Sequence, residues 1–112
     1  MMVTLTTTGR KTERPREVRL YAWEDGDRLV IVGSRGGSAK DPAWAHNLRA
    51  EPRATVRRGK QSDLMRAHEV TGGDERERLW QLVTAAFPLY KSYQRRTART
   101  LPLFVLERVA GD

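Results

Sequence analysis

Short apolar runs along the first third of the chain are typical of β-strands. Residues 3–8 are rich in β-branched side chains and end at Gly9. Residues 16–23 alternate, so that Val18, Leu20 and Ala22 face one way and Arg19, Tyr21 and Trp23 the other. The segment 24–27, Glu-Asp-Gly-Asp, predicts a hairpin turn. It leads into residues 28–33, whose Leu-Val-Ile-Val run is typical of a strand buried on both faces. These patterns predict three strands in meander order.

The middle of the chain predicts a short helix followed by a second hairpin. Asp41 is expected to cap a helix that has Pro42 at its first position and runs to about Ala50. Glu51-Pro52 ends that helix. Residues 53–58 and 61–70 then form a hairpin across Gly59-Lys60.

The last third predicts helices and a closing strand. Thr71-Gly72-Gly73-Asp74 is expected to open a helix as a capping box. Its core-facing positions recur at helical spacing: Leu79, Leu82, Val83 and Ala86. A helical turn follows Pro88 to about Thr97, and residues 103–109 form a final strand. About six strands with two or three short helices predict a single α+β domain over residues 1–112, a small antiparallel barrel.

Composition narrows the classes of protein. The 112 residues include no cysteine, which excludes disulfides and thiolate chemistry, and His46 and His68 have no partner at metal-ligand spacing. No apolar stretch approaches the roughly 20 residues needed to span a bilayer, and residues 1–8 are too polar for a signal peptide. We therefore expect a cytoplasmic protein without a metal site.

Positive charge is concentrated in the first half of the chain. The net charge is +7, and residues 1–60 contain 13 Lys and Arg against 7 Asp and Glu. Such a field attracts nucleic acid, an anionic membrane or a phosphorylated cofactor, although a solvated basic surface that only maintains solubility fits equally well.

Two segments could bind an anion. Arg10, Lys11, Arg14 and Arg16 follow the turn at Gly9 within seven residues and suit phosphate or carboxylate; the alternative is an ordinary basic hairpin tip. Ser34-Arg35-Gly36-Gly37 places flexible backbone beside a cation, which favours an anion nest and lets a ligand approach the main chain. Neither segment has a Walker or GxGxxG pattern.

Two further segments could line a pocket. Trp44 and Asn47 share a face of the helix that begins at Pro42, and together they offer an apolar wall and an amide to a heterocycle. Tyr90 and Tyr93 are also three residues apart and offer phenolic donors. For both pairs, simple packing is the alternative. Because the chain has no recognisable nucleophile or acid–base set, an enzyme of this sequence would rely on a cofactor for its chemistry.

Taken in order, these segments resemble the deazaflavin-dependent nitroreductase family of actinobacterial split β-barrel reductases. The resemblance covers nearly the whole chain and rests on the following segments: Thr6 to Lys11 with Pro15-Arg16, Leu20-Tyr21, Asp25-Gly26, Gly33 to Gly37, Lys40 to Trp44, Asn47-Leu48, Glu75 to Trp80, Tyr90, Tyr93 and Leu101-Pro102. Three positions differ from the usual pattern of the family: Glu13 replaces Gly, Arg35 replaces Lys and Phe87 replaces Tyr. The resemblance also implies that the chain begins at its first strand, without the segment that relatives carry over the substrate pocket.

The resemblance implies that the chain binds coenzyme F420, a deazaflavin with a phosphate and an oligoglutamate tail. By analogy, Arg10, Lys11, Arg16 and Lys40 would hold the phosphate and the acidic tail. The ring system and phosphate would meet Ser34 and the backbone of Gly33, Arg35, Gly36 and Gly37, while Pro42, Trp44, Asn47, Leu48 and Tyr21 would flank the cofactor. Tyr90 and Tyr93 would shape the substrate side and donate a proton, and Ser34 is the third catalytic candidate.

The implied reaction is hydride transfer from reduced deazaflavin to a quinone, a nitroaromatic or another electron-poor unsaturated compound. Two alternatives stay open: a related barrel that binds flavin mononucleotide, and a non-catalytic nucleic-acid-binding module. The expected partner is a small hydrophobic substrate and not a nucleic acid. Monomer and homodimer both stay open, as does peripheral membrane association through a lipophilic substrate.

Overall fold

Seven strands and three helices make up the computed structural model, which describes residues 1–109. The strands are β1 (Met2–Thr8), β2 (Pro15–Tyr21), β3 (Trp23–Asp25), β4 (Arg28–Val32), β5 (Arg53–Arg58), β6 (Gln61–Glu69) and β7 (Leu103–Arg108). The helices are α1 (Ala43–Ala50), α2 (Gly73–Ala86) and α3 (Leu89–Arg95), and a 3₁₀ turn, η1 (Arg35–Gly37), follows β4.

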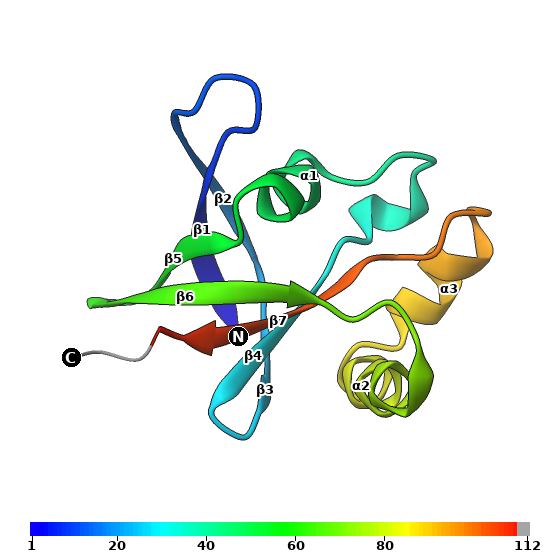
Figure 1. Ribbon diagram of the computed structural model, residues 1–112. Coiled ribbons are helices and arrows are strands. Elements are labelled where there is room, and N and C mark those ends of the chain that lie inside the picture. Colours follow the sequence, from blue (N-terminus) through cyan, green and yellow to red (C-terminus); the bar gives the residue numbers. More distant parts are fainter. Residues whose placement is uncertain (110–112) are drawn as a thin grey trace.

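All seven strands belong to one curled antiparallel sheet in the order β2-β1-β5-β6-β7-β4-β3 (Figure 1). The two edge strands are consecutive in sequence. The single strand predicted over residues 16–23 is therefore two strands: its first part pairs with β1 and its last part with β4. The change of partner falls after Ala22, which still pairs with Met1: its amide donates to the Met1 carbonyl (2.7 Å), and its carbonyl accepts from the Met1 amino group (2.8 Å). The two edge strands are thus joined through Ala22 in a curled, half-open sheet, and the predicted fold class, a split β-barrel, is confirmed with seven strands.

Two apolar cores explain why the Leu29–Val32 run is continuous. Leu29 and Ile31 lie in a core that includes α1, while Val30 and Val32 pack on the other face with α2 and α3. Strand β7 is shared in the same way, since Phe104 and Leu106 join the first core and Leu103 and Val105 join the second. The prediction of a strand buried on both faces is confirmed.

The predicted helix caps are wrong in detail. Pro42 occupies the cap position of α1 and not its first helical turn, and the carboxylate of Asp41 pairs with two arginines instead of capping the helix. Gly72, which has no side chain, occupies the cap position of α2, so no capping box forms. Of the predicted core stripe, Ala86 is exposed because it lies at the end of α2.

The helices flank the sheet at two places. Helix α1 lies beside the tip of the β1–β2 hairpin, whereas α2 and α3 lie together at the opposite side, with η1 next to α3 (Figure 1). Among residues 1–109, no helix has the length and apolar content required to cross a bilayer.

Candidate functional site

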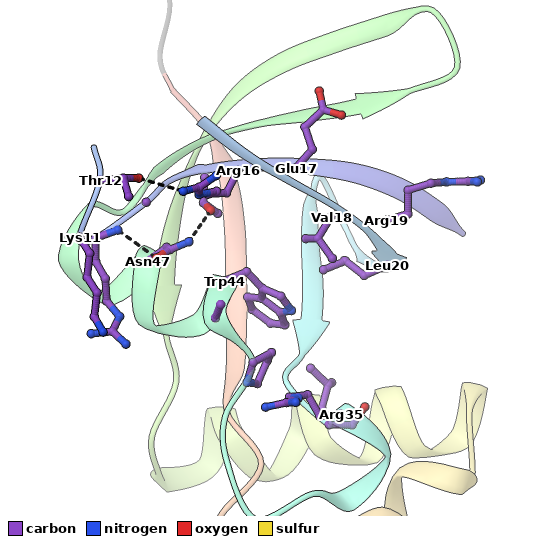
Figure 2. A pocket seen from close by; sticks show the side chains of 17 residues that line it. Lys11, Thr12, Arg16, Glu17, Val18, Arg19, Leu20, Arg35, Trp44 and Asn47 are labelled. Carbon is purple, nitrogen blue, oxygen red and sulfur yellow. Dashed lines mark hydrogen bonds between the residues drawn. The ribbon is translucent and has the colours of Figure 1, made fainter. Parts of the chain in front are cut away.

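A cavity of about 830 Å³, hereafter the principal pocket, opens between three segments of the chain. Its lining comes from the tip and second strand of the β1–β2 hairpin, from the end of β4 with Ser34 and Arg35, and from the start of α1 (Figure 2). This volume falls within the range of about 300–1,000 Å³ that is typical of cofactor sites.

Basic residues lie around the principal pocket. Its lining contains Arg10, Lys11, Arg16, Arg19 and Arg35 but only one carboxylate, that of Glu17. These five basic side chains are exposed. They come from the hairpin and from η1, and together they give the pocket a positive field that favours an anion.

The pocket also has an apolar wall. Val18 and Leu20 of β2 face Trp44 across the pocket in Figure 2, and Val32 and Pro42 complete this wall. The indole of Trp44 also packs edge-on against Phe104, with ring centroids 5.7 Å apart. Trp44 is therefore both a core residue and a pocket residue, so packing and pocket lining, the two alternatives predicted for it, are both found. A flat apolar ring can lie against such a wall.

Asn47 fastens α1 to the hairpin tip. Its Nδ2 donates to Thr7 Oγ1 (3.0 Å), and its Oδ1 accepts from the backbone amide of Arg10 (3.0 Å) (Figure 2). The side chain is buried and both ends of its amide have protein partners. Asn47 lines the pocket as expected, but its amide positions the basic turn.

Residue 13 is held in the left-handed region. Glu13 has a φ of 59°, and its amide donates to the carbonyl of Gly9 (2.7 Å), closing the basic turn. Glycine adopts this conformation without a steric penalty. Glycine, which the resemblance gives as the usual residue at this position, would therefore hold this backbone without strain, and Glu13 adopts the same conformation.

The glycines after β4 serve contacts within the protein. A Cβ on Gly37 would lie 2.7 Å from the carbonyl oxygen of Tyr93, and one on Gly33 would lie 2.7 Å from Pro102 Cγ. Neither glycine lines the principal pocket. Their missing side chains make room for neighbouring parts of the protein, and not for the ligand that we expected to approach them. Arg35, Gly36 and Gly37 all have positive φ, and this turn directs the loop onto α3.

A second, shallower hollow of about 500 Å³ adjoins the principal pocket. Arg10, Arg35 and Ala43 line both cavities, and Lys40 and His46 line only the second. The predicted role of Lys40 therefore belongs to this neighbouring hollow. The side chain of Lys40, with those of Arg10 and Arg35, extends the positive field of the principal pocket along the protein surface.

The predicted tyrosines gather in an aromatic cluster outside the principal pocket. Tyr21, Trp23, Phe87, Tyr90 and Tyr93 have neighbouring rings with centroids 4.7 to 6.5 Å apart. The Tyr90 hydroxyl is buried and accepts a hydrogen bond from Trp23 Nε1 (3.1 Å). Burial raises the pKa of Tyr90 above its ordinary value, which outweighs the opposing effect of the Trp23 bond. Tyr90 therefore keeps its proton at neutral pH.

The structure brings together a majority of the predicted cofactor residues. The principal pocket collects Arg10, Lys11, Arg16, Ser34, Arg35, Pro42, Trp44 and Asn47. It does not include Tyr21, Gly33, Gly36, Gly37, Lys40 or the buried Leu48. Sequence reasoning missed Thr7, Val18, Arg19 and Leu20 as lining residues. The alternation of residues 16–23 places Val18 and Leu20 on one face of their strand, but alternation alone does not distinguish a residue of a pocket wall from a residue of the core.

Comparisons with known proteins agree on one family. The model of the F420H(2)-dependent quinone reductase family matches residues 1–108. An F420H(2)-dependent quinone reductase of Mycobacterium tuberculosis is 41% identical over 106 residues, which are 93% of this chain and 71% of that protein. A second M. tuberculosis protein, described as a putative F420H(2)-dependent quinone reductase, is 33% identical over 73% of this chain and 68% of its own length.

Solved structures give the same result. An F420-H2 dependent reductase (FDR-A) superposes with a TM-score of 0.85 at 37% identity, over 95% of this chain and 93% of that one. Another structure, described as a domain-swapped dimer, also has a TM-score of 0.85 at 37% identity, over 95% of this chain and 79% of that one. With a family match across nearly every described residue, the chain belongs to the F420H(2)-dependent quinone reductase family of oxidoreductases.

Proposed function

We propose that this chain holds reduced F420 in the principal pocket and uses it to reduce a quinone. This proposal rests on the lining of the principal pocket, which places five basic side chains beside an apolar wall. F420 combines a flat ring system with a phosphate and an acidic tail, which match the apolar and the basic residues of the pocket. Family membership favours this ligand over flavin mononucleotide or nucleic acid.

The residues present fit the cofactor. Arg10, Lys11 and Arg16 on the basic turn would bind the phosphate through guanidinium and ammonium groups. Trp44, Val18 and Leu20 would cover the ring system and keep water from it. Lys40 and the second hollow would take the oligoglutamate tail, because that hollow continues from Arg10 and Arg35.

When bound, F420H2 supplies a hydride. The chain's own contribution is to orient the reactants and to stabilise negative charge that forms on the acceptor. Ser34 can donate its hydroxyl proton in a hydrogen bond from the edge of the pocket. Arg35, next to it, adds a fixed positive charge.

The aromatic cluster is the proposed acceptor side. Tyr21 is exposed on the face of β2 opposite to Leu20, where its ring stacks with Trp23 and Phe87 and offers a stacking surface of the aromatic cluster. Tyr93 is half-buried, and its backbone contacts the loop that carries Ser34. A planar quinone suits these aromatic faces. Tyr90 retains its phenol proton because burial raises its pKa.

Turnover with a short-chain quinone tests this proposal. Oxidation of F420H2 is followed by the return of the visible absorbance of the oxidised cofactor, with a nitroaromatic acceptor in parallel. We expect the quinone to be reduced, and we expect Ser34→Ala to lower kcat by on the order of tenfold or more. Ser62→Ala is the matched control, since this serine is exposed on β6 and does not line the principal pocket. Turnover of the nitroaromatic alone, or none with either acceptor, would overturn the quinone assignment.

A further inference from the structure

Arg99, in the connection between α3 and β7, forms hydrogen bonds to the loop that follows β4. Its Nε donates to the Ser38 carbonyl (2.8 Å), and its Nη2 donates to the Ser34 carbonyl (2.9 Å). Its Nη1 donates to the Gly33 carbonyl (3.0 Å) and to Asp41 Oδ1 (2.7 Å). One guanidinium thus holds both ends of the segment 33–38.

These hydrogen bonds determine which polar groups of the loop are occupied and which are free. The carbonyls of Gly33, Ser34 and Ser38 turn toward the guanidinium, so their partial negative charges are neutralised by it. Among residues 1–109, the backbone amides of Ser34, Arg35 and Gly36 have no protein acceptor. Free backbone amides beside a cationic side chain, here that of Arg35, favour an anion.

The Arg99 side chain is itself held in place. It is only 14% exposed, and Asp41, which is 17% exposed, pairs with it. Asp41 also accepts from Arg49 (2.9 Å), which in turn is bridged to Glu69 (2.8 Å). The charge of Arg99 is therefore largely balanced within the protein, and four of its five N–H groups are occupied.

We propose that Arg99 is a positioning residue for cofactor binding. It acts through the loop 33–38, by keeping carbonyl oxygens away from the anionic cofactor and holding the Ser34 and Arg35 groups at the edge of the principal pocket. Asp41 is its partner in this task. The inference rests on the proposed function, because the loop matters to binding only if F420 occupies that pocket.

A direct cationic contact is the competing role, since Arg99 also lines the second hollow. The two roles differ in what lysine can replace. Lysine keeps the charge but cannot present the planar fork that reaches three carbonyls and a carboxylate. A contact through charge alone would survive Arg99→Lys, whereas a positioning role would not.

The test measures the Kd of F420 by cofactor fluorescence at several salt concentrations, for Arg99→Lys and Arg99→Gln. We expect both variants to weaken binding by on the order of tenfold, with the salt dependence of wild type. Arg95→Lys, on the exposed face of α3, is the control and should bind as wild type does. Wild-type affinity in Arg99→Lys, or a loss confined to Arg99→Gln together with a shallower salt dependence, would overturn the inference.

Asp41→Asn gives a second readout of opposite sign and covers the case in which the Arg99 variants fail to fold. Removing a carboxylate near an anionic ligand should tighten binding by simple electrostatics, whereas loss of the Arg99 anchor should weaken it. We expect weaker binding, and tighter or unchanged binding would contradict the inference. Glu69→Gln disturbs Arg49 alone and controls for that shared pair. Absence of F420 binding by the wild-type chain would instead count against the proposed function.

Discussion

At the scale of single residues, the basic turn shows how a departure from a family pattern can be absorbed. Glu13 has a left-handed backbone, which costs an L-residue roughly 1–2 kcal/mol relative to a right-handed one. The neighbouring hydrogen bonds, Glu13 to Gly9 and Gly9 to Arg14, impose this conformation. The sequence identified position 13 as unusual, but only the dihedral angle shows why glycine is preferred there.

We expect Glu13→Gly to stabilise the fold by about 0.5–1 kcal/mol, because relief of backbone strain exceeds the added freedom of the unfolded chain. It should also tighten F420 binding, since a carboxylate next to the basic turn is removed. Glu13→Ala removes the same charge but keeps the strained backbone, so it should tighten binding without stabilising the fold. Urea unfolding of both variants separates the two effects, and equal stability of the two would argue against strain at this position.

Residue roles were predictable where charge decides them and not where packing does. Arg10, Lys11 and Arg16 line the pocket as their clustering indicated. The role of Asn47 could not be foreseen, because its partners Thr7 and the Arg10 amide lie about 40 positions away in the sequence. Arg99 carried no local signal for the same reason: its acceptors are carbonyls of a distant loop.

At the scale of elements, periodicity identified strands and helices but not their exact limits. The alternation of residues 16–23 is continuous, yet the partner strand changes after Ala22, and such a change leaves no mark in the pattern. The cap predicted from Asp41 failed because that carboxylate has stronger partners in Arg49 and Arg99.

The contact between η1 and α3 gives a prediction at this scale. Gly37→Ala would place a methyl group 2.7 Å from the Tyr93 carbonyl oxygen, and we expect it to cost roughly 3 kcal/mol and to weaken F420 binding. Gly36→Ala is the matched control: its φ is also positive, but nothing lies within 4 Å of the added atom. Strain alone should cost that variant about 1 kcal/mol. Equal losses of unfolding free energy in the two variants would show that the approach of the loop to α3 is not tight.

At the scale of the whole molecule, the site is built from the first half of the chain and supported by the second. Every lining residue of the principal pocket lies between Thr7 and Asn47, within the first 60 residues, whose 13 basic side chains outnumber the 7 acidic ones. The second half supplies Arg99, and α3 against which the loop packs. The family, the fold class and the basic character of the site could be predicted from the ordered series of sequence segments. The support by Arg99 and α3 could not, because it depends on tertiary contacts.

The β3–β4 hairpin is joined to α2 by Asp25, which accepts from Arg78 (2.9 Å) and Arg28 (2.6 Å). These hydrogen bonds hold the pKa of Asp25 well below its usual value of 3.8. A lowered folded-state pKa contributes stability that is complete above the unfolded pKa and disappears as pH falls through the folded one. Asp25→Asn should therefore destabilise the protein by about 2 kcal/mol at pH 7, and by progressively less at acidic pH. Urea unfolding across this range measures the difference, with Asp27→Asn in the exposed turn as control; a pH-independent loss would refute the linkage.

Occupation of the principal pocket by F420 is the central claim, and a fluorescence titration of the purified chain with F420 at low and high salt tests it most directly. We predict saturable binding that weakens as salt rises. Lys11→Ala should weaken it by on the order of tenfold through loss of a charge-assisted contact. Lys60→Ala, in the β5–β6 turn outside this pocket, should leave it unchanged. Absence of saturable binding, or equal affinity in the wild type and Lys11→Ala, would contradict the assignment of this pocket to the cofactor.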